Sequence, residues 1–362
     1  MTTVSIVESS TLNVDCGLDL LTSGNVFVDD ITESLTHKGS WVARQVGDTI
    51  HGTCDLVLSR QLAWGSDRVR PWMKLTDATG ASQTWYLGVY VMVTPTRSAA
   101  ESPTTYSVQG YDLLSILNVP YGSTYALATS AVVLTAIGTL LTAAGGINAV
   151  SQAAIASTLP AAKVWPIDSE NTTLSIVNEL LAVIGYESLW VDRDGRWRAD
   201  PLAPDSVKPP VWTYDASPDA VQTTTVGEDR AESADYFSTP NRWVFVNDDA
   251  AALPTEGAGI YTVSNAADGP TSIAARGRTI TKVVHLSAAS QTALVTQADI
   301  IVAADKRIAR TVETSVGPNP THWHNEVVTF TDPALGASGV WKVTGWTLPL
   351  DGGDMSLSLE AV

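Results

Sequence analysis

Cysteine, charge and export signals are all scarce in this sequence of 362 residues. Its 2 cysteines, Cys16 and Cys54, are too few for a disulfide framework, so we expect two free, buried thiols. Charged residues make up 16% of the chain, against about 25% in an ordinary globular protein. So sparse a surface charge predicts an oligomer or assembly whose neighbours bury much of the exterior. The N-terminus lacks the basic region and apolar core of a secretory signal, which predicts a protein made in the cytoplasm.

Motifs for catalysis and cofactor binding are also missing. The sequence contains no nucleophile elbow, Walker loop, dinucleotide fingerprint or His-Glu-x-x-His zinc motif. We therefore predict no catalytic residues, no cofactor, no metal site and no enzymatic activity. Acidic residues are numerous, so counting alone does not exclude a carboxylate pair for glycoside hydrolysis.

Among the 5 histidines, only His322 and His324 cluster in the sequence. On a strand they would share one face, and Glu326 would add a third possible metal ligand. The alternative is a loop or strand edge with packed or solvated imidazoles, because no fourth ligand lies nearby. His51 and Cys54 are interpreted as a packed core pair and not as a nucleophile with its base.

Acidic residues outnumber basic residues by 38 to 21, which gives a net charge of −17. Free nucleic acid and anionic membranes would be repelled by this charge. The same field suits a surface along which DNA passes without binding, and ordinary acidic solubility is the alternative explanation.

One uncharged stretch invites a membrane interpretation. No Asp, Glu, Lys or Arg occurs between Asp112 and Lys163, and residues 125–150 are long enough to span a bilayer. Threonines interrupt this segment, and Val133, Ile137 and Leu140 recur at helical spacing. The pattern predicts a buried amphipathic helix, with no stable membrane insertion.

Strand patterns dominate residues 1–110, which are predicted to form one β-barrel or sandwich. Residues 111–204 differ, with helices predicted over 129–144 and 173–184 and a hairpin whose turn is 192–195. The acidic turn resembles the start of a calcium loop, but no glutamate follows at the required spacing, so we predict a plain Asp-Gly turn. Prolines over 201–210 mark a boundary. Beyond it we predict irregular strands, a helix over 288–310 and strands to the end.

A short motif occurs twice, once in each strand-rich region. The sequence Leu75-Thr-Asp, then Gly80-Ala-Ser and Trp85, is repeated as Phe330-Thr-Asp, then Gly336-Ala-Ser and Trp341. Each copy is followed by a strand-like run. The repetition predicts two similar β-modules separated by an α/β insertion.

Residues 66–75, 86–95 and 106–112 resemble the first domain of tail hub proteins from long-tailed bacteriophages that infect actinobacteria. Segments 189–197, 272–277 and 317–321 extend this resemblance over most of the chain. It implies a mainly β protein with α+β insertions, built from two tube-like β-barrel domains and two smaller outer α/β domains. The first barrel would be residues 1–110, and 111–204 would be an outer domain. The second barrel would be split between 205–250 and 311–362, with 251–310 inserted as the other outer domain, including the helix 288–310.

The resemblance also implies a function without a catalytic site. Three copies would form a ring at the distal end of the tail tube, adapt sixfold to threefold symmetry and leave a channel for DNA ejection. The expected partners are further copies of this chain, the distal tail ring, tail tube and tape measure proteins, and tail-tip or fibre proteins, with DNA only in transit. The expected location is the tail tip of the virion. A tail-associated cell-wall hydrolase and a carbohydrate-binding tail-tip adhesin are the alternatives.

Overall fold

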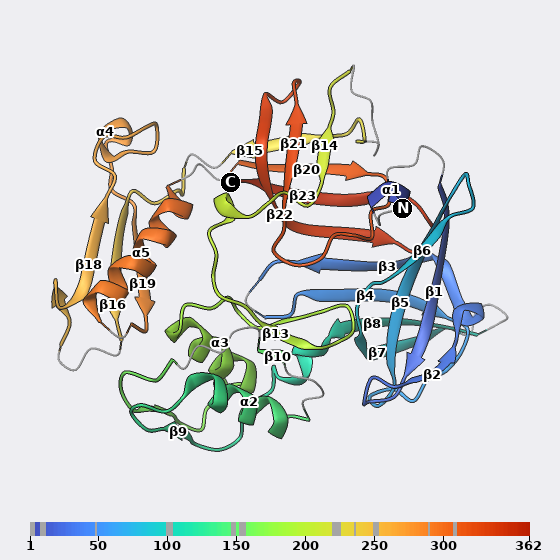
Figure 1. Cartoon of the computed structure of the whole chain (residues 1–362), viewed down its shortest axis with the longest axis horizontal. Coiled ribbons are helices and arrows are strands. Elements are labelled where there is room, and N and C mark those ends of the chain that lie inside the picture. The colour runs from blue at the N-terminus through green and yellow to red at the C-terminus, as the bar shows by residue number, and fades with distance from the viewer. Residues whose placement is uncertain are drawn as a thin grey trace.

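The structure, a computed structural model, is organised around one large curved β-sheet (Figure 1). It describes residues 4–7, 12–47, 49–98, 104–145, 150–151, 157–218, 226–234, 237–248, 253–288, 290–306 and 310–362. The large sheet has 14 strands, and smaller sheets of 3, 2 and 4 strands flank it. The protein is therefore mainly β with a few helices, as the sequence predicted.

The N-terminal β-module consists of strands β1 to β8 and supplies one half of the large sheet. Its elements are α1 (Val4–Val7), β1 (Leu12–Leu21), β2 (Phe27–Asp30), the 3-10 turn η1 (Thr32–Ser34), β3 (Leu35–Gln45), β4 (Gly52–Leu58), β5 (Arg68–Asp77), β6 (Ser82–Tyr86), β7 (Tyr90–Ser98) and β8 (Thr105–Asp112). In β4 every second side chain is buried, among them Cys54, Leu56 and Leu58. Alternation of this kind is the pattern of a strand that covers a core with one face.

The C-terminal β-module supplies the other half of the sheet. Its elements are η3 (Asp205–Val207), β14 (Thr213–Asp215), β15 (Ala231–Ala234), β20 (Arg310–Val316), β21 (Val327–Asp332), β22 (Ala337–Pro349) and β23 (Met355–Ala361). The repeated motif marks the same hairpin in both modules. Trp85 lies opposite Met73 in the β5–β6 hairpin, and Trp341 lies opposite Val328 in the β21–β22 hairpin. The predicted similarity of the two regions is confirmed at these hairpins.

The two modules are joined edge to edge. Residues 345–349 of β22 pair antiparallel with residues 41–45 of β3, and we call this pairing the seam. One hydrophobic cluster runs beneath both halves, with Leu56 of the first module and Leu357 of the second among its members. The expected pair of separate β-barrels is corrected here, because the described strands form one continuous sheet and no closed barrel. The sequence carries no local signal that would predict pairing between two edge strands so far apart along the chain.

An outer α/β region packs beside the sheet and follows the N-terminal module. It contains η2 (Leu113–Ile116), β9 (Tyr125–Leu127), α2 (Val133–Ala143), β10 (Val150–Ser151), β11 (Lys163–Trp165), α3 (Thr173–Val183), β12 (Trp190–Val191) and β13 (Trp197–Ala199). Both predicted helices are present. The Thr172 hydroxyl caps α3 by accepting a hydrogen bond from the Ser175 N–H at 3.0 Å, and Gly185 follows with φ 71°. Across the predicted hairpin turn, the Asp192 carboxylate accepts from the Arg196 N–H and also pairs with Arg198.

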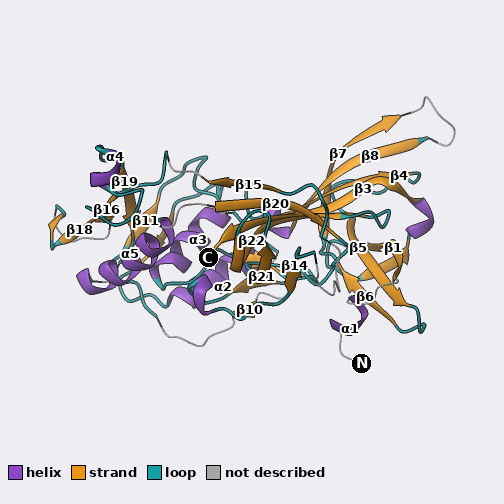
Figure 2. Ribbon diagram, turned by 90° about the horizontal axis from the view of Figure 1, so that it is seen from above, coloured by secondary structure: helices purple, strands orange, loops and turns teal. Residues whose placement is uncertain are grey.

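A side unit is inserted between β15 and β20 (Figure 2). It contains β16 (Arg242–Asn247), β17 (Thr255–Glu256), β18 (Gly259–Ser264), α4 (Ile273–Arg276), β19 (Thr281–Leu286) and α5 (Gln291–Asp305). Helix α5 packs Leu294, Ala298 and Val302 against Trp243 and Phe245. The helix predicted over 288–310 is thus shorter, and positions 289 and 307–309 lie outside the described residues.

Strand β16 requires a correction. The expected domain division placed residues 241–246 in the second β-barrel, but β16 pairs with β18 and β19 in the 4-stranded sheet. Its alternating pattern fits any sheet with one covered face, so the pattern did not identify its partners. The remaining domain boundaries stay predictions. Among the described helices, none is long and apolar enough to cross a membrane.

Candidate functional site

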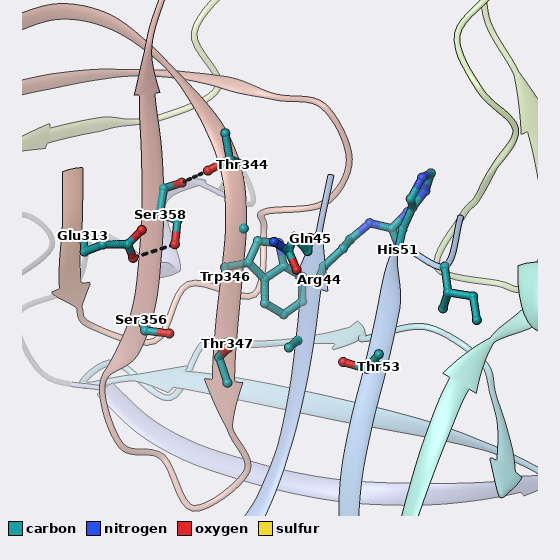
Figure 3. A pocket seen from close by; sticks show the side chains of 13 residues that line it. Arg44, Gln45, His51, Thr53, Glu313, Thr344, Trp346, Thr347, Ser356 and Ser358 are labelled. Atoms are coloured by element: carbon teal, nitrogen blue, oxygen red, sulfur yellow. Dashed lines mark hydrogen bonds between the residues drawn. The ribbon is translucent and has the colours of Figure 1, made fainter. Parts of the chain in front are cut away.

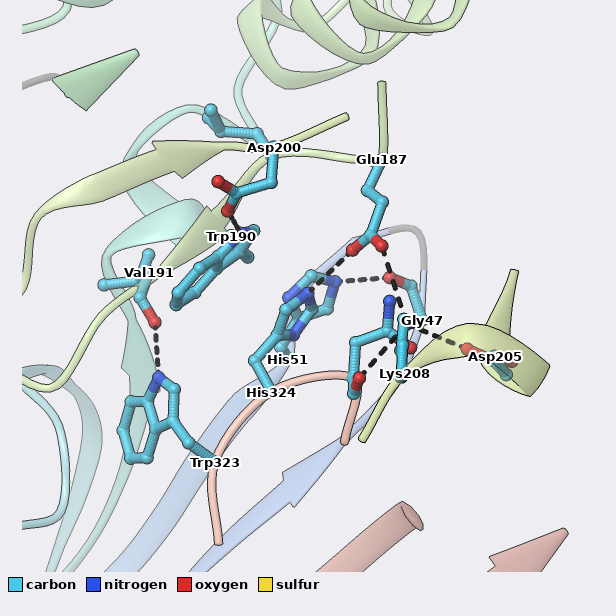
Figure 4. Close-up of polar contacts among 12 residues, drawn as sticks. Gly47, His51, Glu187, Trp190, Val191, Asp200, Asp205, Lys208, Trp323 and His324 are labelled. Atoms are coloured by element: carbon cyan, nitrogen blue, oxygen red, sulfur yellow. Dashed lines mark hydrogen bonds and ion pairs between the residues drawn. The ribbon is translucent and has the colours of Figure 1, made fainter. Parts of the chain in front are cut away.

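The predicted histidines lie in a buried polar junction, where the core side of the sheet meets the β12–β13 hairpin and the loop 317–326. Its members are Arg44, His51 and Asp112 of the sheet, Glu187, Trp190 and Arg193 of the outer region, and His322, Trp323, His324 and Glu326 of the loop. Figure 4 shows the histidine end of this junction. It fastens the outer α/β region and the C-terminal β-module to the N-terminal one.

Three aromatic rings form a stacked column in the polar junction. The His324 ring lies 5.1 Å from the His51 ring at 24° and 4.7 Å from the Trp190 ring at 15°, measured between centroids (Figure 4). His324 Nε2 is 3.8 Å from a Glu187 carboxylate oxygen. Burial lowers the pKa of His324, while the Glu187 carboxylate opposes this shift. Each of the three rings comes from a different part of the chain, so the column packs those three parts against one another.

Arg44 is the buried cation at the centre of the polar junction. Its guanidinium lies 4.3 Å above the Trp323 ring and donates to the Val191 carbonyl at 3.2 Å. It makes no ion pair with a described carboxylate, and its Nε has no hydrogen-bond partner there. Burial therefore lowers the pKa of Arg44, with Asp112 and Glu326 among the charges that oppose the shift. A desolvated guanidinium is costly, and the indole face and the carbonyl offset that cost only in part.

Asp112 faces Arg44 across a glycine. Its carboxylate accepts from the Gly52 N–H at 2.7 Å and the Leu114 N–H at 3.0 Å, yet burial still raises its pKa. A Cβ on Gly52 would approach the Asp112 side chain to 3.2 Å. The absence of a Cβ at Gly52 therefore lets the Asp112 carboxylate lie close against the β4 backbone.

Trp323 contacts two arginines. In addition to Arg44, the Arg193 guanidinium lies 4.6 Å from the centre of its ring, and the indole N–H donates to the Val191 carbonyl at 3.1 Å. Arg193 also donates to the carbonyls of Thr321 at 2.8 Å and His322 at 3.0 Å. One arginine of the outer hairpin therefore fixes the backbone of the loop that carries both histidines.

The two predicted histidines point to different partners. His322 Nε2 lies 2.6 Å from the Tyr214 hydroxyl, and its Nδ1 lies 3.1 Å from Glu326, whereas His324 turns toward Glu187. They lie on a loop, so the shared strand face does not form. Within the described ranges, no group of three or more His, Cys, Asp or Glu residues could hold a metal ion.

His51 and Cys54 do not form a reactive pair. His51 contacts the Gly47 carbonyl through Nε2, and burial and the nearby Arg44 lower its pKa to about 3. Burial raises the pKa of the Cys54 thiol well above its usual value. Neither group is suited to proton transfer or nucleophilic attack near neutral pH. Both cysteines are free and buried, as predicted.

Sequence reasoning identified the histidines but missed Arg44, Arg193 and Trp323. Their signal in the sequence is weak, because an arginine on a strand is ordinarily a solvated residue. Only the alternation of β3 carries a hint, since it places Arg44 on the same side as Val42.

A second feature is the outer face, the solvent side of strands β20, β23, β22, β3, β4 and β8. Register and alternation place these side chains on it: Thr311, Glu313, Ser315, Ser356, Ser358, Glu360, Lys342, Thr347, Trp41, Ala43, Gln45, Thr53, Asp55, Val57, Ser107, Gln109 and Tyr111. Most are small or carry a hydroxyl or amide. The one basic residue in this set, Lys342, pairs with Asp205 at 3.1 Å.

The outer face is hollowed along the seam (Figure 3). A depression of about 340 Å³ is lined by both modules, with Gln45 and Thr53 on one side and Ser356 and Ser358 on the other. Glu313 accepts a hydrogen bond from the Ser358 hydroxyl at 2.6 Å, so its carboxylate is held against the sheet. The arrangement suits contact with another surface and offers no group poised for catalysis.

Comparison with known proteins points to one kind of fold. No family model and no curated protein matches the sequence. A tail protein from Neisseria meningitidis matches with a TM-score of 0.65 over 96% of this chain and 97% of its own, at 16% identity. The 43 kDa tail protein of prophage MuSo2 from Shewanella oneidensis matches with a TM-score of 0.61 over 95% and 98%, at 13% identity.

A prophage tail protein from Listeria monocytogenes matches with a TM-score of 0.57 over 96% of this chain and 94% of its own, at 9% identity. All three alignments include the modules, the outer region and the side unit, since they span nearly the whole chain. The protein therefore has the fold of phage tail proteins.

Proposed function

We propose that this chain is a structural tail hub protein of a long-tailed bacteriophage that infects actinobacteria, and that it works without catalysis. The observation that carries the proposal is the pair of similar β-modules joined in one sheet, within a fold that tail proteins share over nearly their full length. Three copies form a ring at the distal end of the tail tube. Two modules in each copy give that ring a near-sixfold face toward the tube and a threefold face toward the tip.

The outer face supports the part of the proposal that concerns DNA. Its charged members are Asp55, Glu313, Glu360 and the paired Lys342. A channel lined by such a surface offers DNA no unpaired cations, so the genome passes without the counterion release that drives binding. Further partners in this proposal are the distal tail ring, tail tube, tape measure and tail-tip or fibre proteins, and the location is the tail tip.

Mass measurement of the purified protein and of isolated tails tests the ring. We expect three copies per tail, and a stable hexamer would instead indicate a distal tail ring protein. The gene should lie just downstream of a very long tape-measure gene in the genome of an actinobacterial phage. Incubation with host peptidoglycan tests the hydrolase alternative, and release of soluble fragments by the purified chain would contradict a purely structural role.

A further inference from the structure

A cleft lies between helix α5 of the side unit and the segment 202–206, which follows the outer α/β region. Its volume is about 730 Å³, and Asn325 and Lys342 of the C-terminal β-module also line it. Figure 1 shows the side unit beside the large sheet. Clefts of about 300–1,000 Å³ with mainly apolar walls are the usual form of a binding site. The position and size of the cleft therefore suit a bound partner.

Helix α5 carries apolar side chains on two of its faces. Leu294 and Ala298 face the core of the side unit. Ile300 and Ala303 lie on a different face, and this second face lines the cleft. A surface helix ordinarily carries polar residues on the side away from its core. Leu202, which is 46% exposed, lines the cleft from the other side. Both walls thus present apolar side chains that the described part of the chain leaves partly uncovered.

The charged groups of the cleft are three carboxylates and one ammonium. The ammonium of Lys342 is paired with Asp205 at 3.1 Å, and Asp305 pairs with a lysine of β19. Asp299 is different, because its exposed carboxylate pairs with no described cation and accepts a hydrogen bond from the Tyr261 hydroxyl at 3.2 Å. The cleft therefore offers a single unpaired negative charge beside its apolar walls.

We propose that the cleft binds a segment of another protein that carries apolar side chains and a lysine or arginine. The apolar side chains of the segment cover Ile300 and Leu202, and its cation pairs with Asp299. Phosphate and carboxylate ligands are disfavoured by the acidic lining, which excludes nucleic acid and anionic lipid. A second copy of this chain is a poor source of the cation, because the chain has 38 acidic and only 21 basic residues. The inference goes beyond the proposed ring and gives the side unit a partner.

Fluorescence anisotropy with three short labelled peptides and the purified full-length chain tests the chemistry of the cleft. The peptide sequences alternate leucine with lysine, leucine with glutamate, and serine with lysine. Only the leucine–lysine peptide should bind with saturation. Equal binding of the serine–lysine peptide would indicate general attraction to an acidic protein and overturn the inference. A leucine–lysine peptide that does not bind would overturn it as well.

Two variants and two matched controls locate the binding. Ala303→Trp fills the cleft from an exposed helix position and should abolish saturable binding, and Asp299→Lys should weaken it about three- to tenfold. Val283→Trp adds the same bulk to the face of the side-unit sheet turned away from α5, and Asp248→Lys reverses an exposed charge outside the cleft. Both controls should bind like the wild type. Equal weakening by a control and its matched variant would contradict binding in the cleft.

Photo-crosslinking in isolated tails identifies the partner. Thr296 is exposed and lines the cleft, so Thr296→benzoylphenylalanine places the reactive group there. We expect an adduct with an apolar segment of a different protein that contains lysine or arginine. An adduct with a second copy of this chain, or no adduct, would overturn the inference. Three copies per tail in the same sample would still leave the proposed ring standing.

Discussion

Acid should loosen the polar junction, and His51 should account for a measurable share of the effect. Burial and Arg44 lower the pKa of His51 from 6.5 to about 3 in the folded chain. When the polar junction opens, the imidazole regains its ordinary pKa, so between these two values the open state binds more protons. The closed polar junction is therefore not weakened by His51 above pH 6.5, and its stability falls progressively as the pH is lowered from 6.5 toward 3.

The two pKa values set the size of the effect. Lowering the pH from 7 to 5 should reduce the free energy of opening by about 2 kcal/mol through His51 alone. His324 acts in the same direction, because burial lowers its pKa as well. Contacts also lower the pKa of Glu187 and Asp205, but their contributions are lost only when the pH falls through the carboxylate range. Burial raises the pKa of Asp112, so this carboxyl acts in the opposite direction, and the comparison with a His51 variant isolates the share of the histidine.

Hydrogen exchange of residues 186–199, corrected for the intrinsic pH dependence of exchange, measures this opening directly. The wild-type chain should lose protection at pH 5, and His51→Phe should lose clearly less, because phenylalanine keeps the ring but cannot take a proton. His285→Phe is the control, since His285 is exposed and pairs with Asp248 far from the polar junction. Equal pH dependence in the wild type and in His51→Phe would refute the reasoning.

Three further predictions concern packing and the thiols. Gly17→Ala should destabilise the chain by about 1–3 kcal/mol in thermal unfolding, because its Cβ would lie 2.1 Å from Trp72 and force the indole to move. Gly138→Ala should instead stabilise it by about 0.5–1 kcal/mol, since Gly138 lies in α2 with open space around it; a loss of stability would contradict this. Neither Cys16, whose pKa burial raises to about 12, nor Cys54 should react with a thiol reagent at pH 8 until the chain is unfolded, and fast labelling of the native protein would contradict their burial.

Local elements could be predicted because their signals are local. Helix α3 follows from the spacing of Leu174, Val177 and Leu181, with Thr172 before it and Gly185 after it. The repeated hairpins follow from turn chemistry, because an aspartate accepts backbone N–H groups in each turn. These features depend on residues a few positions apart, so the sequence displays them directly.

The seam and the polar junction could not be predicted in the same way. The seam pairs Trp346 with Arg44, and the polar junction packs Trp323 on that same arginine, although the partners come from opposite ends of the chain. Strand patterns state which face of a strand is buried but not which edge lies beside it. The function of His324 as the middle ring of a column likewise depends on Trp190 and His51, which no local spacing connects.

The position of the side unit indicates which part of the fold carries the function. It enters between β15 and β20, two strands that pair with each other in the large sheet. An insertion at a connection leaves the strand ladders intact, so the large sheet keeps its outer face. The outer α/β region is likewise attached after β8 and fastened through the polar junction. The seam and the outer face are therefore built by strands of the two β-modules, and these are the features on which the proposed function depends.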